Sequence, residues 1–324
     1  MIMRDNLICD AHCDTVLDLA KKRRELAELS TSGHLDIPRL KRGKVDVQVF
    51  AAYIEKQYKP YRSLSRALQL IDCLLLELQK NNDKIELAAS FSDIEKIVSS
   101  NKIAAILAIE GGEALEGKLY HLRNFYRLGV RILTLTWNQS NDIADGSAYP
   151  DSKRGLTYFG KQVVKEMNQL GMIIDVSHIS PSGFWSVLKN SSQPVIASHS
   201  NCYQLCPHRR NLKNEQIKAI AEKGGLICVT YVSDFLIRKK RKATMDDILT
   251  HIDYLVNLVG VDFVGLGSDF DGCRILPEGL EGADKVFTIG EKLTEKGYSR
   301  EDVNKIMGKN FLRFFQQVTN RNEK

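Results

Sequence analysis

Three histidines and three acidic residues stand at the ends of short apolar runs: His12, Asp14, Glu110, His178, His199 and Asp269. The other four histidines fall in stretches with loop or helix patterns. Six ionisable groups gathered in one buried place would repel one another or stay unsatisfied unless a cation lay between them. Three imidazoles with two or three carboxylates suit zinc, either as one ion or as two ions that share a carboxylate.

The spacing of these residues favours chelation. His12 and Asp14 are two apart at the end of a predicted strand, so both point to one face and offer two ligands to one divalent cation. Glu110 follows mostly aliphatic residues and is costly to bury unpaired. The run that ends at Trp137 supplies no lysine that could be carbamylated, so Glu110 is the natural bridge between two ions. No predicted strand ends in lysine, which argues against a Schiff-base aldolase.

Each of these residues alone has an ordinary structural explanation. A single histidine at a strand end is more often a satisfied core residue than a ligand, and Glu110 could cap the next helix. Asp271, in the same loop as Asp269, is expected to be a helix N-cap. The metal hypothesis therefore depends on the six residues together.

Eight apolar runs must position these residues. Near-continuous apolar strands are buried on both faces, which indicates parallel pairing. The predicted strands are Leu7–Asp14, Val45–Tyr53, Ile103–Gly111, Val130–Trp137, Met172–His178, Pro194–Ser200, Gly225–Tyr231 and Phe263–Asp269. Helical patterns lie between or after them, at Ser63–Lys80, Leu156–Leu170, Pro181–Lys189, Asn214–Lys223, Met245–Val259, Ala283–Lys296 and Ser299–Val318.

Eight strands alternating with helices predict an α/β fold, a (β/α)₈ TIM-like barrel, with residues 1–324 as one domain. A doubly wound open sheet is the alternative. That fold should carry a glycine-rich phosphate loop after an early strand, and the first run instead ends in Asp10-Ala-His-Cys-Asp14. In a barrel the carboxyl ends of the strands form the site, which is where the six residues stand.

The composition excludes several classes of protein. The 324 residues are 43% hydrophobic and 27% charged, as in an ordinary globular protein, and no apolar run is long enough to span a membrane. The net charge of +6 is modest. The basic run at 238–242 has no interleaved aromatic residues, so we expect a solvated loop and no nucleic-acid partner. Seven cysteines without a Cys-x-x-Cys pair, and no hydrophobic leader, predict a cytoplasmic location.

Several motifs together resemble the membrane (renal) dipeptidases, peptidase family M19 of the amidohydrolase superfamily, along nearly the whole chain. They are Asp10-Ala-His-Cys-Asp14, Ala108-Ile-Glu-Gly-Gly112, Arg131-Ile-Leu-Thr-Leu-Thr136, Ile174-Asp-Val-Ser-His178, Ser198-His-Ser200, Arg209-Arg-Asn211, Gly267-Ser-Asp-Phe-Asp-Gly272 and Gly308-Lys-Asn-Phe-Leu-Arg313. The resemblance implies a zinc-dependent metallopeptidase that hydrolyses dipeptides, including L-D dipeptides, by means of a water that bridges two zinc ions. It also implies a homodimer in some members.

The resemblance assigns roles residue by residue. His12 and Asp14 would bind one zinc ion, His178 and His199 the other, and Glu110 would bridge them. Asp269 would be the catalytic acid and base, and Arg210 would bind the free carboxylate of the dipeptide, for which a planar guanidinium is suited.

One position departs from the family. Mammalian members have a histidine that contacts the scissile carbonyl where this chain has Trp137. An indole donates one hydrogen bond and carries no positive charge. Stabilisation of the oxyanion would then fall to the zinc ions or to Asn138. The departure bears on substrate range and rate and leaves the predicted metal ligands intact.

Two other functions compete with a dipeptidase. A lactonase or phosphotriesterase could use the same metals, but its neutral substrate would not depend on Arg210. A binding scaffold without catalysis is the second alternative. It predicts loss of metal ligands, whereas all five and Asp269 are present.

Overall fold

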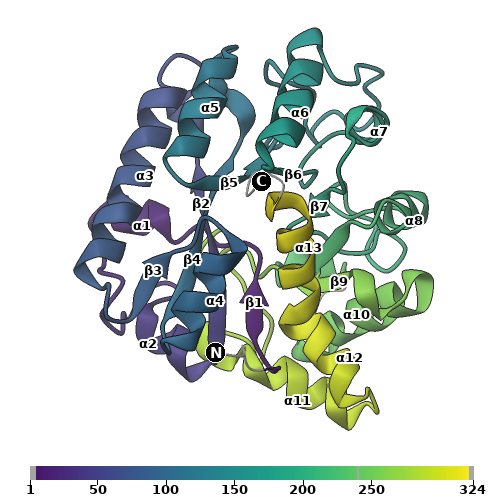
Figure 1. Ribbon diagram of the computed structural model, residues 1–324. Helices are drawn as coiled ribbons and strands as arrows, with labels where there is room; N and C mark the ends of the chain where they lie inside the picture. Colours follow the sequence, from purple (N-terminus) through teal and green to yellow (C-terminus); the bar gives the residue numbers. More distant parts are fainter. Residues whose placement is uncertain (1–4, 239–240, 321–324) are drawn as a thin grey trace.

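The computed structural model describes residues 5–238 and 241–320, and its centre is a barrel of parallel strands (Figure 1). In the described residues the strands pair in the order β1 (Ile8–Asp10), β2 (Val45–Tyr53), β4 (Ile103–Glu110), β5 (Val130–Thr134), β6 (Ile173–Asp175), β7 (Ile196–Ala197), β8 (Leu226–Val229) and β9 (Val264–Leu266). A backbone hydrogen bond of 2.9 Å from Ala11 to Leu266 joins β1 to β9. The barrel is therefore nearly closed, as the sequence predicts.

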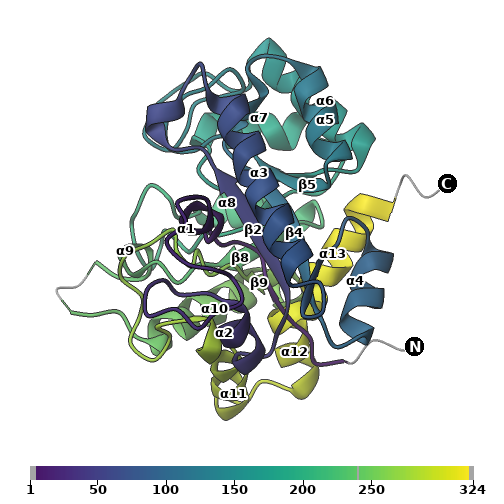
Figure 2. The same ribbon diagram turned by 90° about the vertical axis from the view of Figure 1, so that its left-hand side faces the viewer.

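Helices surround the barrel in both views (Figures 1 and 2). The α-helices of the described residues are α1 (Val16–Ala20), α2 (Ile37–Arg42), α3 (Ser63–Lys80), α4 (Phe91–Ser99), α5 (Leu119–Arg127), α6 (Tyr158–Leu170), α7 (Pro181–Asn190), α8 (Asn214–Glu222), α9 (Ser233–Leu236), α10 (Met245–Val259), α11 (Phe287–Glu295), α12 (Arg300–Asn304) and α13 (Asn310–Thr319). Helix α13 packs against α4 and against several strands (Figure 2).

The inside of the barrel is filled by alternate residues of the strands. One buried cluster contains every second residue of β4, together with residues of α13, namely Ala104, Ile106, Ala108, Phe311, Phe314 and Phe315. Successive side chains of a strand point to opposite faces, so this cluster lies on the inner face, and α13 contributes to it. Glu110 continues the same alternation and therefore points into the barrel at the carboxyl end of β4.

The predicted elements agree with the structure except at several ends and short segments. Each of the eight predicted strands contains an observed strand, and helices α3 and α10 have the predicted bounds. Strand β3 (Ile85–Leu87), which pairs with β4, was not predicted, nor were α1, α2, α4, α5 and α9. The predicted last helix is α12 and α13 joined by a π-helical turn, Lys305–Lys309.

Two further expectations concern the surface. Residues 239–240 of the basic run lie outside the described residues, so the predicted loop is described only at its flanks. None of the helices in residues 5–238 and 241–320 has the length and apolarity needed to cross a membrane.

Candidate metal centre

The sequence-predicted ligands lie together at the carboxyl ends of the strands. Glu110 is the last residue of β4, and the others stand two to four residues beyond the ends of β1, β6 and β7, as His12, Asp14, His178 and His199. All five are buried. Asp269 follows β9, and its side chain is 13% exposed. Parallel strands present their carboxyl ends at one rim, which brings together side chains from across the sequence.

The two carboxylate oxygens of Glu110 face different imidazoles. Its Oε1 lies 2.9 Å from Nε2 of His178 and 3.7 Å from Nε2 of His199. Its Oε2 lies 3.7 Å from Nε2 of His12. The Nε2 atoms of His178 and His199 are 2.8 Å apart. Glu110 thus stands between a pair of imidazoles on one side and a third imidazole on the other.

A second group of ligand atoms surrounds His12. Donor atoms of His12, Asp14 and Asp269 lie within 4.8 Å of one another, as do those of His12, Glu110 and His199. A Cβ atom on Gly272 would lie 2.2 Å from Oδ1 of Asp269 and 2.3 Å from Oδ2 of Asp14. Glycine at this position therefore leaves room for both carboxylates.

The chemistry of this donor set fits divalent cations. Nε2 of His12 and Oδ1 of Asp14 have no hydrogen-bond partner in the described part of the chain, although both are buried. Burial lowers the pKa values of His178 and His199 well below the ordinary value, so both imidazoles are neutral and keep a lone pair. Burial and then the carboxylate of Asp269 raise the pKa of Glu110. A divalent cation would offset the repulsion between these buried carboxylates and stabilise their charged forms.

Asp269 has a different environment from the other carboxylates. Burial raises its pKa to about 7, against the opposing effect of the Arg210 guanidinium. A carboxyl group with a pKa near neutrality can both accept and release a proton.

Hydrogen bonds beneath the centre orient His199. Ser198 Oγ donates to Oδ2 of the buried Asp175 at 2.6 Å and lies 2.8 Å from Nδ1 of His199. Because its hydrogen is given to Asp175, Ser198 can only accept from His199, which places the imidazole proton on Nδ1. The Nε2 atom then keeps its lone pair towards Glu110 and His178.

His178 is oriented in the same way by a different residue. Its Nδ1 lies 2.9 Å from Oδ1 of Asn138, which also accepts a hydrogen bond of 2.7 Å from Ser147. The Nε2 atom of His178 is again left free of the proton. These supporting roles of Asp175, Ser198 and Asn138 were not predicted from the sequence. The Ile174–His178 and Ser198–Ser200 motifs around two of them are the signal that the sequence offers.

Two of the site residues have strained backbones. His178 has φ of +67° and Asp269 has φ of +63°. Residues other than glycine rarely adopt this left-handed region, and such strain persists only where surrounding structure imposes it. These conformations turn the two side chains towards the centre directly after the strands end.

The expectation that Asp271 caps a helix is wrong. Its carboxylate accepts hydrogen bonds of 2.6 Å from Thr15 Oγ1 and from the backbone of His34, and it forms an ion pair with Arg24. Asp271 therefore joins the loop after β9 both to Thr15, directly before α1, and to the segment after α1.

A cavity of about 370 Å³ opens onto the centre. Asp14, Glu110, His178 and Asp269 line it, and so does Trp137, whose ring lies 5.9 Å from that of His178 between centroids. The indole thus forms part of the wall at the position where the resemblance implied a histidine.

Arg210 lies beside the centre but lines a different cavity. It is buried, its Nη2 donates to the backbone oxygen of His199 at 3.1 Å, and its Nε has no partner among the described residues. Burial lowers its pKa to about 10, which leaves it cationic at neutral pH. The free Nε atom is available to an anionic group.

Comparisons with known proteins agree on one family. The family model described as membrane dipeptidase (peptidase family M19) matches residues 1–324. A protein of Claviceps purpurea (strain 20.1) described as dipeptidase tcpJ is 32% identical over 296 residues, which cover 89% of this chain and 70% of that protein.

Two solved structures have nearly the same fold. A crystal structure of "dipeptidase AC", a metallopeptidase of family M19, has a TM-score of 0.91 at 27% identity over 97% of this chain and 99% of that one. A Rhodobacter sphaeroides metallopeptidase liganded with a phosphinate mimic of the dipeptide L-Ala-D-Ala has a TM-score of 0.91 at 26% identity, over 96% and 99% of the two chains.

Proposed function

Because the chain belongs to the membrane dipeptidase family, peptidase family M19, we propose that this metallopeptidase hydrolyses dipeptides with two zinc ions held by the residues described above. The family makes it a dipeptidase. The two ions, their ligands and the preference for substrate are our proposal. We also propose that residues 1–324 act as one catalytic domain.

The observation that carries this proposal is the position of Glu110 between the histidines. His178 and His199 would hold one zinc ion through their Nε2 atoms, and His12 with Asp14 would hold the other. Glu110 would serve both ions, since its carboxylate lies 2.9 Å from Nε2 of His178 and 3.7 Å from Nε2 of His12. When bound, such ions lower the pKa of a shared water towards neutrality and polarise the scissile carbonyl.

The remaining chemistry falls to side chains of this chain. Asp269, at the edge of the cavity, would take the proton of the attacking water on a carboxylate oxygen and give it to the leaving amine. Arg210 would bind the terminal carboxylate and so align the peptide bond. Trp137 would exclude water from one side. Asn138 offers its amide nitrogen to the oxyanion, since its Oδ1 already serves His178 and Ser147.

We propose that L-D dipeptides are among the substrates. The Rhodobacter sphaeroides protein to which this chain is similar was crystallised with a mimic of L-Ala-D-Ala. A screen of L-L, L-D and D-L dipeptides with the zinc-loaded enzyme tests the proposal. Hydrolysis of L-L dipeptides alone would contradict the stereochemical part, and hydrolysis of none would contradict the function.

We also propose a cytoplasmic location, and the cysteines support it. All seven are free in the structure, five of them buried. Free thiols persist in reducing compartments.

The role of Arg210 predicts a dependence on the charge of the substrate. Converting the terminal carboxylate of a dipeptide to an amide should lower kcat/KM of the wild type about tenfold to a hundredfold, because a charge-assisted hydrogen bond is worth about 1.5–3 kcal/mol. The same change should cost the Arg210→Met variant much less, since the partner is already absent. Steady-state kinetics on both substrates measure the coupling. Equal losses in both enzymes would show that Arg210 does not bind the carboxylate.

The hydrogen bonds of Ser198 predict an effect on metal affinity. The Ser198→Ala variant removes the acceptor of the His199 Nδ1 proton, so the imidazole is no longer held in one tautomer. Loss of such a supporting contact typically weakens metal binding about 10–100-fold. Competition with a chromophoric chelator measures the affinity. The exposed Ser92→Ala variant is the control, and equal zinc affinities in the two variants would contradict the assigned role.

A further inference from the structure

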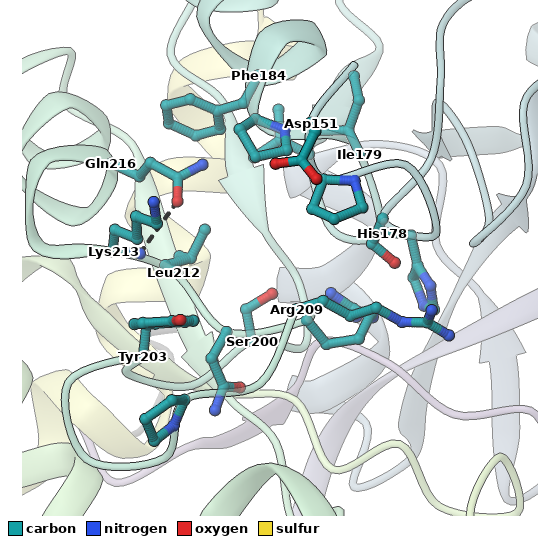
Figure 3. A pocket seen from close by; sticks show the side chains of 17 residues that line it. Asp151, His178, Ile179, Phe184, Ser200, Tyr203, Arg209, Leu212, Lys213 and Gln216 are labelled. Atoms are coloured by element: carbon teal, nitrogen blue, oxygen red, sulfur yellow. Dashed lines mark hydrogen bonds between the residues drawn. The ribbon is translucent and has the colours of Figure 1, made fainter.

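A second cavity lies beside the metal centre and shares a wall with it. It has a volume of about 340 Å³, within the usual range for small-ligand sites. His178 lines both this cavity and the cavity that opens onto the metal centre. Figure 3 shows His178 and Arg209 towards one side of the second cavity, with Lys213 and Gln216 on the other side. We call this space the Arg209 cavity.

Positive charge predominates around the Arg209 cavity. Arg209, Arg210 and Lys213 line it, against a single carboxylate, that of Asp151. Arg209 and Lys213 are exposed, and neither forms an ion pair with a carboxylate in the described ranges. The ammonium of Lys213 lies 5.8 Å from the ring centroid of Tyr203. The excess of cations favours an anionic group inside the cavity.

The other residues that line the cavity fit the aliphatic part of a ligand. Val176, Ile179, Phe184 and Leu212 line the Arg209 cavity and are buried, and Ser147 and Ser200 add hydroxyl groups. A ligand that matches this lining has a short apolar chain with an acidic end. The side chains of glutamate and aspartate have that form.

Arg210 connects the Arg209 cavity to the reaction. Its guanidinium donates to the backbone of the metal-centre residue His199, and its unpartnered Nε is buried. A terminal carboxylate bound there belongs to the residue on the leaving side of the scissile bond. The side chain of that residue branches from the carbon that carries the carboxylate, and Arg210 lines the Arg209 cavity, so the cavity is within reach of that side chain.

We propose that the Arg209 cavity receives the side chain of the C-terminal residue and that Arg209 and Lys213 select acidic residues there. This inference rests on the proposed dipeptidase function and names its substrate class: dipeptides that end in glutamate or aspartate. Asp151 opposes the selection, because its carboxylate lines the same cavity.

A pair of isosteric substrates isolates the charge. The zinc-loaded enzyme is assayed with L-Ala-Glu and L-Ala-Gln, each with the C-terminal residue in the L and the D form. We expect kcat/KM for the Glu substrate to exceed that for the Gln substrate about three- to tenfold, the effect of two exposed charges. The ratio should fall in Arg209→Met and in Lys213→Met, and it should rise in Asp151→Asn. Added salt should reduce it, because the charges are exposed.

The exposed Arg42, on α2 and outside the cavity, provides the matched control. Arg42→Met makes the same charge change and should leave the Glu/Gln ratio as in the wild type. A wild-type ratio near one, or a ratio that neither Arg209→Met nor Lys213→Met alters, would overturn the selection while the dipeptidase function stands. Failure to hydrolyse any of the four substrates would instead count against the proposed function.

Discussion

The Asp269→Asn variant is expected to keep its zinc and its fold and to lose about 10²–10⁴-fold in kcat, the usual contribution of a general acid–base group. Asparagine preserves the shape of the side chain but cannot accept the proton of the attacking water. It also tolerates the left-handed backbone that Asp269 adopts, with φ of +63°, better than most residues do. The substitution therefore removes the proton acceptor with little change in conformation.

Three measurements separate loss of the proton acceptor from general damage. Elemental analysis should give the wild-type zinc content, thermal unfolding should give a similar Tm, and steady-state kinetics should give the loss of kcat. Asp83→Asn, at a carboxylate that is 66% exposed on a turn, is the matched control. Near-normal kcat in Asp269→Asn at neutral pH would exclude Asp269 as the acid and base.

The Glu110→Ala variant is expected to lose more than one of two zinc equivalents. A bridging carboxylate serves both ions, so its removal weakens both sites, whereas removal of a terminal ligand weakens one. Hydrolysis should fall about 10³-fold or more, since a metal supplies several kcal/mol of transition-state stabilisation and each 1.36 kcal/mol is a factor of ten. Elemental analysis after gel filtration gives the zinc content.

A second variant tests whether Glu110→Ala loses zinc only because the smaller side chain disturbs the packing of the site. Glu110→Gln keeps the volume of the side chain and loses one oxygen and the charge, so it should also bind fewer than two ions. The exposed Glu95→Ala on α4 is the control and should keep both. Full zinc occupancy in Glu110→Ala would show that Glu110 does not bridge two ions. If Glu110→Gln bound two ions and Glu110→Ala did not, the loss of zinc in Glu110→Ala would come from altered packing of the site.

Much of the fold could be predicted from the sequence. The run Ile103–Gly111 is apolar on both faces as far as Ile109, and a parallel strand covered on both sides satisfies this pattern. In long amphipathic helices such as Ser63–Lys80, the hydrophobic residues recur with a clear helical period. Strand β3 and helices α1 and α9 are three to five residues long, too short to show any period, and tertiary packing alone defines them.

The topology of the barrel explains why the proximity of the site residues could be predicted. In a barrel of parallel strands every carboxyl end lies at one rim, so the ionisable residues that follow the strands must lie near one another. This brings His12 close to Asp269, although 256 residues separate them. The barrel, the six residues and their position at one rim therefore follow from the sequence alone.

How those residues face one another depends on contacts between distant parts of the chain. Such contacts place one oxygen of Glu110 near His12 and the other near His178. They also orient the imidazole of His199 by a hydrogen bond. A further contact of this kind pairs Asp271 with an arginine, so that Asp271 caps no helix. Such contacts also put Arg210 on the wall of a separate cavity. A local pattern specifies which face of a strand a residue occupies, but the direction of a side chain beyond the strand end depends on neighbours from other strands and loops.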